Sequence, residues 1–342
     1  MYAQAVRIML ALAAAALVLA GCGSSAKPSP SAAAHSSAAS TTTSSVPPAV
    51  SELPAAEHPS AGQFPATRGR TLQQLAALAR GGVQLGPATG VFTPGTDRFA
   101  FALNASSGAF VYAPTAIYIA RGPGSPAQGP LLAPADPMTV APQYRSQQNE
   151  GPGGIQAIYA AEVSLPHAGT YTVLALTRAQ GGLIGAPGQI AVAASSPIPT
   201  VGQAPPAIAT DTPASVGGNT ALVTTRIPPD DMHAVSFKDV LGKRPIALLF
   251  STPQLCMSRV CGPVTDVVVA LEHQFGDRIA FIHEEVYVDN QPSKGLRPQM
   301  QAFHLQTEPW LFTVDRRGRI AARLEGAFGV NTATGALQAA LR

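Results

Sequence analysis

Between residues 90 and about 195, apolar and polar side chains alternate with a period of two. This alternation is typical of half-buried β-strands, and Gly, Pro and Ser residues separate the alternating runs. Because no run with helical spacing lies between them, the pattern predicts an antiparallel β-sandwich rather than an α/β unit. The predicted strands are 97–104, 110–120, 155–165, 169–177 and 188–194.

After residue 232, strand-like apolar runs alternate with segments of helical spacing. Residues 246–250, IALLF, read as a short buried strand, whereas the apolar positions of 264–276 recur at helical spacing. The predicted order is strand, helix, strand, helix, hairpin and helix. Its later elements are a strand at 278–288, a helix at 296–305, a hairpin of 310–315 and 320–326, and a helix at 332–342.

The first 65 residues follow neither pattern. Residues 1–21 carry a positive charge and then an apolar run rich in Ala and Leu, which is typical of an export signal. Residues 22–65 are rich in Ser, Thr, Ala and Pro and predict a disordered tether. A short helix at 70–82 follows, with Thr71 as its N-cap and Gln74 completing a capping box. The predicted later parts are a short helix plus β-sandwich domain at 66–195, a Pro-rich linker at 196–231 and a last domain at 232–342.

The end of the signal, LAGC at 19–22, resembles the lipobox of bacterial lipoproteins. The resemblance implies cleavage before Cys22 and attachment of lipid to its sulfur and its new amino group. Several acyl chains on one residue anchor a protein firmly where one chain does not. We therefore predict a protein anchored in the lipid bilayer of the cell membrane through Cys22 and facing outside the cytoplasm. The alternative is an ordinary signal peptide with a chance cysteine.

Composition limits the partners. Charged residues make up 12% of the chain, the net charge is +3, and no run of Lys and Arg marks a nucleic-acid surface. We therefore predict no nucleic-acid partner. No second stretch of about 18 apolar residues follows the signal, so nothing after it is expected to span a membrane.

With Cys22 taken by lipid, two cysteines remain, Cys256 and Cys261, in the stretch FSTPQLCMSRVCGP. Disulfides form and persist outside the cytosol, and two cysteines are too few ligands for a zinc ion. On a regular helix a five-residue step advances about 7.5 Å and turns away, whereas a disulfide needs Cα atoms about 4.4 to 6.8 Å apart. Cys256 is therefore expected in the loop ahead of the helix. No cofactor and no metal ligand is predicted.

The element order and three motifs of 232–342 resemble thioredoxin-like proteins. The motifs are GKRPIALLF, the strand–cysteine–helix stretch IALLFSTPQLCMSRVCGPV, and TEPWLFTVDRRGRI, in which Pro309 matches the family's cis-proline facing the cysteines. The stretch HEEVYVDN is also similar to actinobacterial lipoproteins with a thioredoxin domain. The resemblance implies catalytic roles for Cys256, Cys261 and Pro309, and a cis bond between Glu308 and Pro309.

The stretch LPHAGTYTV, at 165–173, resembles immunoglobulin-like sandwiches, in which the tyrosine hydroxyl bonds back to a nearby corner. The expected fold is thus an all-β immunoglobulin-like sandwich followed by an α/β thioredoxin-like domain. The sandwich is interpreted as a binding or spacer module rather than a catalytic one.

The chain departs from the thioredoxin-like pattern in two places. Its cysteines are separated by four residues instead of two, and IALLF carries no buried carboxylate, which leaves proton transfer unassigned. CGPV, at 261–264, favours Cys261 as the attacking thiol, because a helix N-terminus stabilises a thiolate. The lengths from Phe250 to Cys256 and from Cys256 to Gly276, in contrast, resemble the family's more closely if Cys256 is its first, attacking cysteine. The attacking cysteine and the direction of electron flow stay open.

Three functions remain. The first is an oxidoreductase that exchanges thiols and disulfides with exported proteins. The second is a non-catalytic binding or assembly lipoprotein with a structural disulfide. The third is copper handling, because copper-delivering relatives of this fold pair two cysteines with a histidine, and His304 lies near the corresponding position.

The other ionisable residues of 232–342 are interpreted as structural. His233, His273 and His283 are expected on the surface or packed, not as ligands. The residues Glu284, Glu285 and Asp289 are expected at a solvated strand end.

Overall fold

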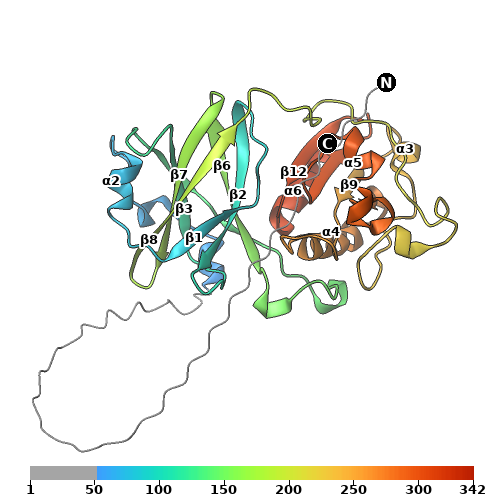
Figure 1. The fold of residues 1–342 in the computed structure, drawn as a ribbon, viewed down its shortest axis with the longest axis horizontal. Helices are drawn as coiled ribbons and strands as arrows, with labels where there is room; N and C mark the ends of the chain where they lie inside the picture. Colours follow the sequence, from blue (N-terminus) through green and yellow to red (C-terminus); the bar gives the residue numbers. More distant parts are fainter. Residues whose placement is uncertain (1–51) are drawn as a thin grey trace, which may run out of the picture. The chain divides into compact units, whose positions relative to one another are not determined.

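The computed structural model describes residues 52–342, which belong to one compact unit spanning 45–342. The export signal, Cys22 and most of the predicted tether lie outside the described residues. Within them, twelve strands form three four-stranded sheets, accompanied by six α-helices (Figure 1). No helix of the described part is both long and apolar enough to cross a membrane.

The first two sheets are antiparallel and enclose a common apolar core. Phe99, Phe101 and Tyr159 of one sheet and Ile117 and Val173 of the other are buried in it. One sheet has the order β1 (Val83–Pro87), β2 (Gly95–Ala105), β6 (Ala157–Leu165) and β5 (Ala135–Pro137). The other has the order β4 (Gln128–Leu132), β3 (Thr115–Ala120), β7 (Gly169–Ala179) and β8 (Gly182–Val192).

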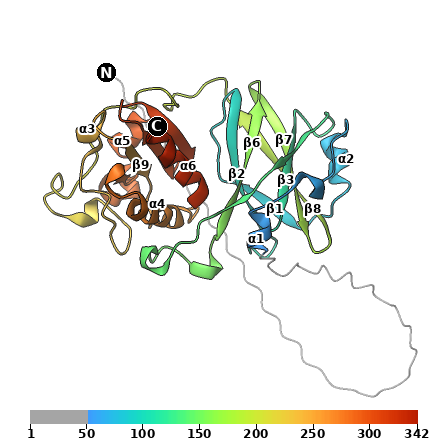
Figure 2. The same cartoon turned by 180° about the vertical axis from the view of Figure 1, so that it is seen from behind.

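The third sheet is mixed. Its order is β10 (Ala280–Glu284), β9 (Ile246–Phe250), β11 (Trp310–Val314) and β12 (Ile320–Glu325). Strands β9 and β10 are parallel, because α4 (Cys261–Phe275) and the short segment after it return the chain to the end of the sheet at which β9 begins. The other neighbouring strands of this sheet are antiparallel. In both views α4 and α6 (Val330–Ala340) lie together beside this sheet (Figures 1 and 2).

The remaining helices are short. The predicted helix at 70–82 is present only as α2 (Leu72–Ala76), and its capping box is confirmed: the Gln74 amide donates to the Thr71 hydroxyl over 3.2 Å. Residues 53–65, assigned to the tether above, include α1 (Leu53–Ala56) and bury Phe64. The others are α3 (Phe237–Val240), α5 (Pro298–Ala302), and 3-10 turns η1 (Ala61–Gln63), η2 (Pro142–Tyr144), η3 (Gly151–Gly153), η4 (Thr220–Leu222), η5 (Gly276–Arg278), η6 (Val288–Asn290) and η7 (Pro292–Lys294).

The predicted fold class is wrong. The described residues do not form an all-β immunoglobulin-like sandwich followed by an α/β thioredoxin-like domain, but three mostly antiparallel sheets and short helices in one compact unit. The Tyr171 hydroxyl does bond back to the backbone of His167, over 3.1 Å, yet this contact is local and does not define the arrangement of the sheets. The predicted boundaries at 66–195, 196–231 and 232–342 stay predictions.

The physical reason is that the third sheet shares its core and its polar contacts with the first. Met138 and Ile158 are buried in the same apolar cluster as Val264 and Phe328. The carboxylate of Asp136, next to Met138, accepts hydrogen bonds from three backbone amides at the start of α6, at 2.9 to 3.0 Å. A carboxylate at this position satisfies unpaired N–H groups and complements the helix dipole.

The Pro-rich segment at 196–231 packs along the third sheet and its helices. Ile198 is buried in the cluster that also holds Phe250 and Trp310. The Arg226 guanidinium forms a buried ion pair with Asp266 of α4, at 3.0 Å. The Pro-rich composition of this segment therefore accompanies an irregular backbone that is nevertheless packed against the rest of the protein.

Gly329, just before α6, provides a test of this shared packing. A methyl group at Gly329 would overlap the Pro137 carbonyl oxygen, whereas one at Gly335, inside α6, meets nothing within 4 Å. Gly329→Ala should therefore lower the free energy of unfolding by about 1–3 kcal/mol, the usual cost of overpacking. The control Gly335→Ala should raise it by about 0.5–1 kcal/mol, because alanine favours a helix interior. Urea unfolding of both variants measures this, and equal stabilities would contradict the packing described here.

Candidate thiol site

The two cysteines lie on either side of the start of α4. Cys261 is the first residue of the helix, and Cys256 lies in the loop that joins β9 to it, as the spacing predicted. The loop is held by backbone hydrogen bonds from the Cys256 amide to Thr252 O and from the Arg259 amide to Cys256 O, at 3.1 and 3.2 Å. Both cysteines are free thiols, and Cys261 is fully buried whereas Cys256 is 7% exposed.

The environment of Cys256 favours its thiolate. The Cys261 thiol lowers its pKa most among the neighbouring groups, and the Ser258 hydroxyl, 3.2 Å from the sulfur, lowers it further. The backbone amides of Ser258 and Cys261 act in the same direction, so the first amide of α4 stabilises the thiolate of the loop cysteine. Together they outweigh partial burial and bring the pKa of Cys256 from 9.0 to about 6.

The environment of Cys261 has the opposite effect. Burial raises its pKa well above 9.0, and the neighbouring Cys256 raises it further as thiolate and hydrogen-bond partner. Although Cys261 begins a helix, desolvation of its buried sulfur is the largest effect on its pKa. At neutral pH one thiol is ionised and its neighbour holds its proton. Of the two thiols, Cys256 is thus the one whose surroundings favour the thiolate.

Glu308 is the third ionisable group of the site. A carboxylate oxygen of Glu308 and the sulfurs of Cys256 and Cys261 all lie within 4.8 Å of one another. Burial, and secondarily the charge of Cys256, raises the pKa of Glu308 to about 7. The following residue, Pro309, is buried, and the Glu308–Pro309 bond is cis as predicted. The strand IALLF carries no carboxylate. The carboxylate near the cysteines belongs instead to Glu308, in the turn before β11.

A groove of about 560 Å³ opens beside the thiols. Its walls come from the cysteine loop, the turn before β11 and the first sheet. Residues that line it include Ser258, Val260, Glu308, Ala102, Phe110 and Ile158. Ala102 and Ile158 of the first sheet therefore line the same groove as Ser258 of the cysteine loop and Glu308, which the sequence did not indicate.

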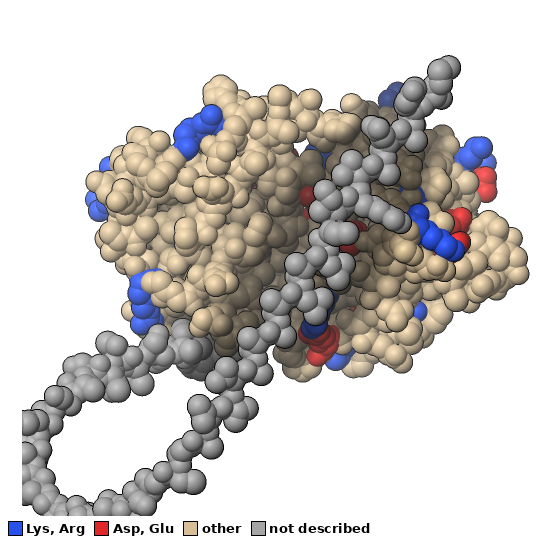
Figure 3. All heavy atoms as spheres, in the orientation of Figure 1, with Lys and Arg blue, Asp and Glu red and all other residues tan. Residues whose placement is uncertain are grey.

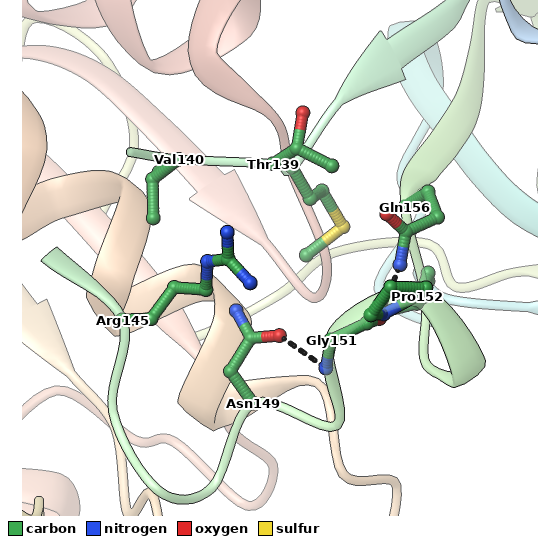
Figure 4. A pocket seen from close by; sticks show the side chains of 9 residues that line it. Thr139, Val140, Arg145, Asn149, Gly151, Pro152 and Gln156 are labelled. Carbon is green, nitrogen blue, oxygen red and sulfur yellow. Dashed lines mark hydrogen bonds between the residues drawn. The ribbon is translucent and has the colours of Figure 1, made fainter. Parts of the chain in front are cut away.

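A smaller cavity, of about 110 Å³, lies between 138 and 156 (Figure 4). Asn149 lines it and accepts a hydrogen bond from the Gly151 amide at 3.0 Å. Arg145 is the single ionisable residue in its lining. An exposed arginine without a charged or nucleophilic partner does not make a reaction site, so this cavity is not assigned one.

The remaining predicted residues divide between surface and interior. His273, His304 and Asp289 are exposed. The expectation of a solvated strand end for Glu284 and Glu285 is wrong, because these carboxylates are 1% and 0% exposed.

Each of these two buried carboxylates has partners that are distant in the sequence. Arg297 lies 3.1 Å from Glu284 Oε1, and the Asp211 amide donates to Oε2. Thr225 donates to Glu285 Oε1 through its amide and its hydroxyl, at 2.6 and 2.7 Å. Glu284 and Glu285 therefore connect the 196–231 segment to the end of β10 through hydrogen bonds.

Charged side chains elsewhere are sparse. On the face drawn in Figure 3 the Lys and Arg residues form isolated spots separated by uncharged surface. This distribution accords with a chain in which 12% of the residues are charged.

Comparison of the chain with models of known protein families found no match, and a search of curated proteins found no relative. The resemblance to thioredoxin-like lipoproteins therefore stays a prediction from the motifs, and the site has to be interpreted from its own geometry.

The thiol asymmetry predicts a pH profile. When the reduced protein is alkylated in its folded state, Cys256 should react first, with a rate that rises as the pH increases through about 6. Cys261→Ala should move this midpoint upward, because the Cys261 thiol is the group that lowers the pKa of Cys256 most. Ser258→Ala should shift it in the same direction by less. Mass spectrometry of the labelled peptides measures this, and preferential labelling of Cys261 would refute the assignment.

Proposed function

We propose that this protein is a thiol–disulfide oxidoreductase in which Cys256 attacks and Cys261 resolves. The observation that carries the proposal is the placement of two free thiols around the start of α4, one in the loop and one buried on the helix, with the Glu308 carboxylate within 4.8 Å of both sulfurs. The surroundings lower the pKa of Cys256 and raise that of Cys261. A thiolate is the reactive form in exchange, and a nearby protonated thiol can complete the reaction.

The reaction balances as two successive displacements. The Cys256 thiolate attacks one sulfur of a partner disulfide, so that a mixed disulfide forms and the partner's other sulfur leaves with the bonding electrons and takes up a proton. Cys261 then loses its proton and attacks the Cys256 sulfur, which releases the second partner thiolate. The partner disulfide is reduced by two electrons and the Cys256–Cys261 pair is oxidised. The same steps in reverse oxidise a partner dithiol.

Glu308 supports the second displacement. Cys261 must lose a proton although burial opposes its ionisation, and the Glu308 carboxylate lies within 4.8 Å of both sulfurs. A carboxyl group with a pKa of about 7 can accept this proton near neutral pH and return it in the reverse reaction. We assign Glu308 this proton-transfer role.

The groove beside the thiols supports a protein partner. Phe110 and Ile158 form an apolar wall of the groove. Ser258 and Glu308, which lie close to the Cys256 sulfur, line the same groove. A partner segment lying against this wall would bring its disulfide to Cys256. With the export signal and the lipid at Cys22, the expected partners are exported proteins outside the cytoplasm.

Neither alternative function has a comparable observation in its favour. A structural disulfide does not require one thiol with a lowered pKa beside a second with a raised pKa. For copper, the third group beside the cysteines is the Glu308 carboxylate and not His304, and a carboxylate is a poor ligand for Cu(I).

Matched single-cysteine variants test the function with a defined probe. After addition of oxidised glutathione, Cys261→Ser should retain a stable mixed disulfide on Cys256, because the resolving thiol is missing. The control Cys256→Ser should form little, since its remaining thiol is buried and protonated. The reduction potential of the natural pair should lie above about −300 mV, below which structural disulfides of secreted proteins fall. A lower potential together with equally unreactive variants would assign the pair a structural role.

The lipid anchor is tested separately. Cys22→Ala should release the protein from the membrane fraction while the potential of the Cys256–Cys261 pair stays unchanged, because the anchor is chemically independent of the thiol site. Membrane fractionation and mass analysis of the mature N-terminus check this. Retention of the variant in the membrane would contradict anchoring through Cys22.

A further inference from the structure

A second group of ionisable residues lies in the interior behind the thiol site. Asp230 and His233 come from the segment before α3, and His283 comes from β10. Their exposed fractions are 8%, 4% and 0%, and one donor atom of each lies within 4.8 Å of the others. The proposed thiol chemistry uses none of these residues.

The Asp230 carboxylate lies between the two imidazoles and contacts each through a different oxygen. His283 Nδ1 lies 3.0 Å from Asp230 Oδ2, and His233 Nε2 lies 3.2 Å from Asp230 Oδ1. The two imidazole rings are 5.1 Å apart between centroids. Ligands about 2.0–2.1 Å from a tetrahedral ion lie roughly 3.3 Å from one another, close to these separations.

His233 distinguishes this group from an ordinary buried ion pair. Within the described residues neither ring nitrogen of His233 has a hydrogen-bond partner, although both are shielded from solvent. Its Nε2 approaches Asp230 Oδ1 to 3.2 Å in a poorly directed contact, and its Nδ1 has no polar atom of the described residues to bond to. A buried polar group without a partner is costly, and such a group in a native protein requires an explanation.

His283 is oriented as a metal ligand would be. Its Nε2 lies 3.1 Å from the Ser251 carbonyl oxygen, to which it can donate its proton. The Nδ1 lone pair then faces Asp230 and His233. Metal-binding histidines usually donate the second ring N–H to a carbonyl or carboxylate in this way, which fixes the tautomer. Thr224 supports the carboxylate in turn, because its hydroxyl donates to Asp230 Oδ2 over 3.2 Å.

From this geometry we propose that Asp230, His233 and His283 bind a divalent transition-metal ion, with Zn²⁺ as the ion that the donor set suits best. Two imidazoles and one carboxylate are a common donor set for zinc. Three protein ligands leave the fourth position of a tetrahedral ion to a water molecule. The ion would join the segment before α3 to β10 and, through Ser251, to the start of the cysteine loop.

The alternative without a metal is an imidazolium–carboxylate pair. In that case His283 carries a proton on both nitrogens, one donated to Asp230 and one to Ser251, in keeping with a pKa raised to about 9 despite burial. This explains Asp230 and His283 but leaves His233 with only the 3.2 Å approach of its Nε2 to Asp230. A metal ion would give this Nε2 a direct ligand bond, while Nδ1 would remain without a partner among the described residues.

The test uses the full chain with Cys256→Ser and Cys261→Ser, so that thiols cannot bind the probe ions. In this background the protein should retain one equivalent of Zn²⁺ after desalting. With Co²⁺ it should show d–d absorption without a thiolate-to-cobalt charge-transfer band, because its ligands are nitrogen and oxygen. His233→Ala should weaken Zn²⁺ binding at least about tenfold, since even outer-shell changes at metal sites cost this much.

His273→Ala is the matched control, because His273 is exposed, and it should bind Zn²⁺ as the background protein does. X-ray absorption of the Zn²⁺-loaded background protein should show imidazole scattering, a readout that does not depend on how well the His233 variant folds. Failure to retain Zn²⁺, or equal affinity in the His233 and His273 variants, would overturn the proposal. Because both thiols are absent, neither result bears on the exchange function.

Discussion

The burial of α4 is the constraint on which the thiol chemistry depends. Cys261 is fully desolvated because its helix is covered on two sides, by the third sheet and by the segment around Gln148. Asp266 holds this cover in place: its carboxylate accepts from Ser146 and Asn149 and pairs with Arg226. A buried ion pair adds little net stability, but removal of one partner costs about 3–5 kcal/mol because an unpaired charge remains. The pair thus specifies a position for α4 more than it stabilises the fold, and that position keeps Cys261 protonated.

The same arrangement explains why a β-rich half accompanies the thiols. An isolated third sheet would leave the first turn of α4 in contact with water, which would remove the desolvation that raises the pKa of Cys261. The first sheet also lines the groove, through Ala102 and Ile158. One set of contacts therefore determines both the burial of Cys261 and the walls of the groove.

Much of the local structure could be predicted from the sequence, and the assembly could not. β9 and β11 were located closely because an apolar run between turn residues is a local signal. β5 was missed because three residues ending in proline carry too little pattern. The fold class failed for a different reason: contacts such as that of Asp136 with Gly329 join residues 193 positions apart, and no local pattern reports them.

The candidate site shows the same division. The sequence placed Cys256 in the loop from helix geometry alone and selected Pro309 by resemblance. It could not place the Glu308 carboxylate beside the sulfurs, because that depends on how the turn before β11 meets the cysteine loop. The burial of Glu285 was missed for the same reason. An acidic stretch is expected to be exposed to solvent unless its hydrogen-bond partner, here Thr225, is known.

The spacing of the cysteines finally explains which of them is favoured as the thiolate. With four residues between them, Cys256 is outside the helix, and the loop returns through Arg259, whose φ of 58° is unfavourable for a side chain. This return brings the Cys256 sulfur to the first amide of α4, so the loop cysteine gains the stabilisation that a helix N-terminus gives a thiolate. Cys261, although it begins the helix, points its sulfur into the interior and is left with the cost of desolvation. Cys261 thus occupies the first position of the helix, whereas Cys256 is the residue whose thiolate is stabilised.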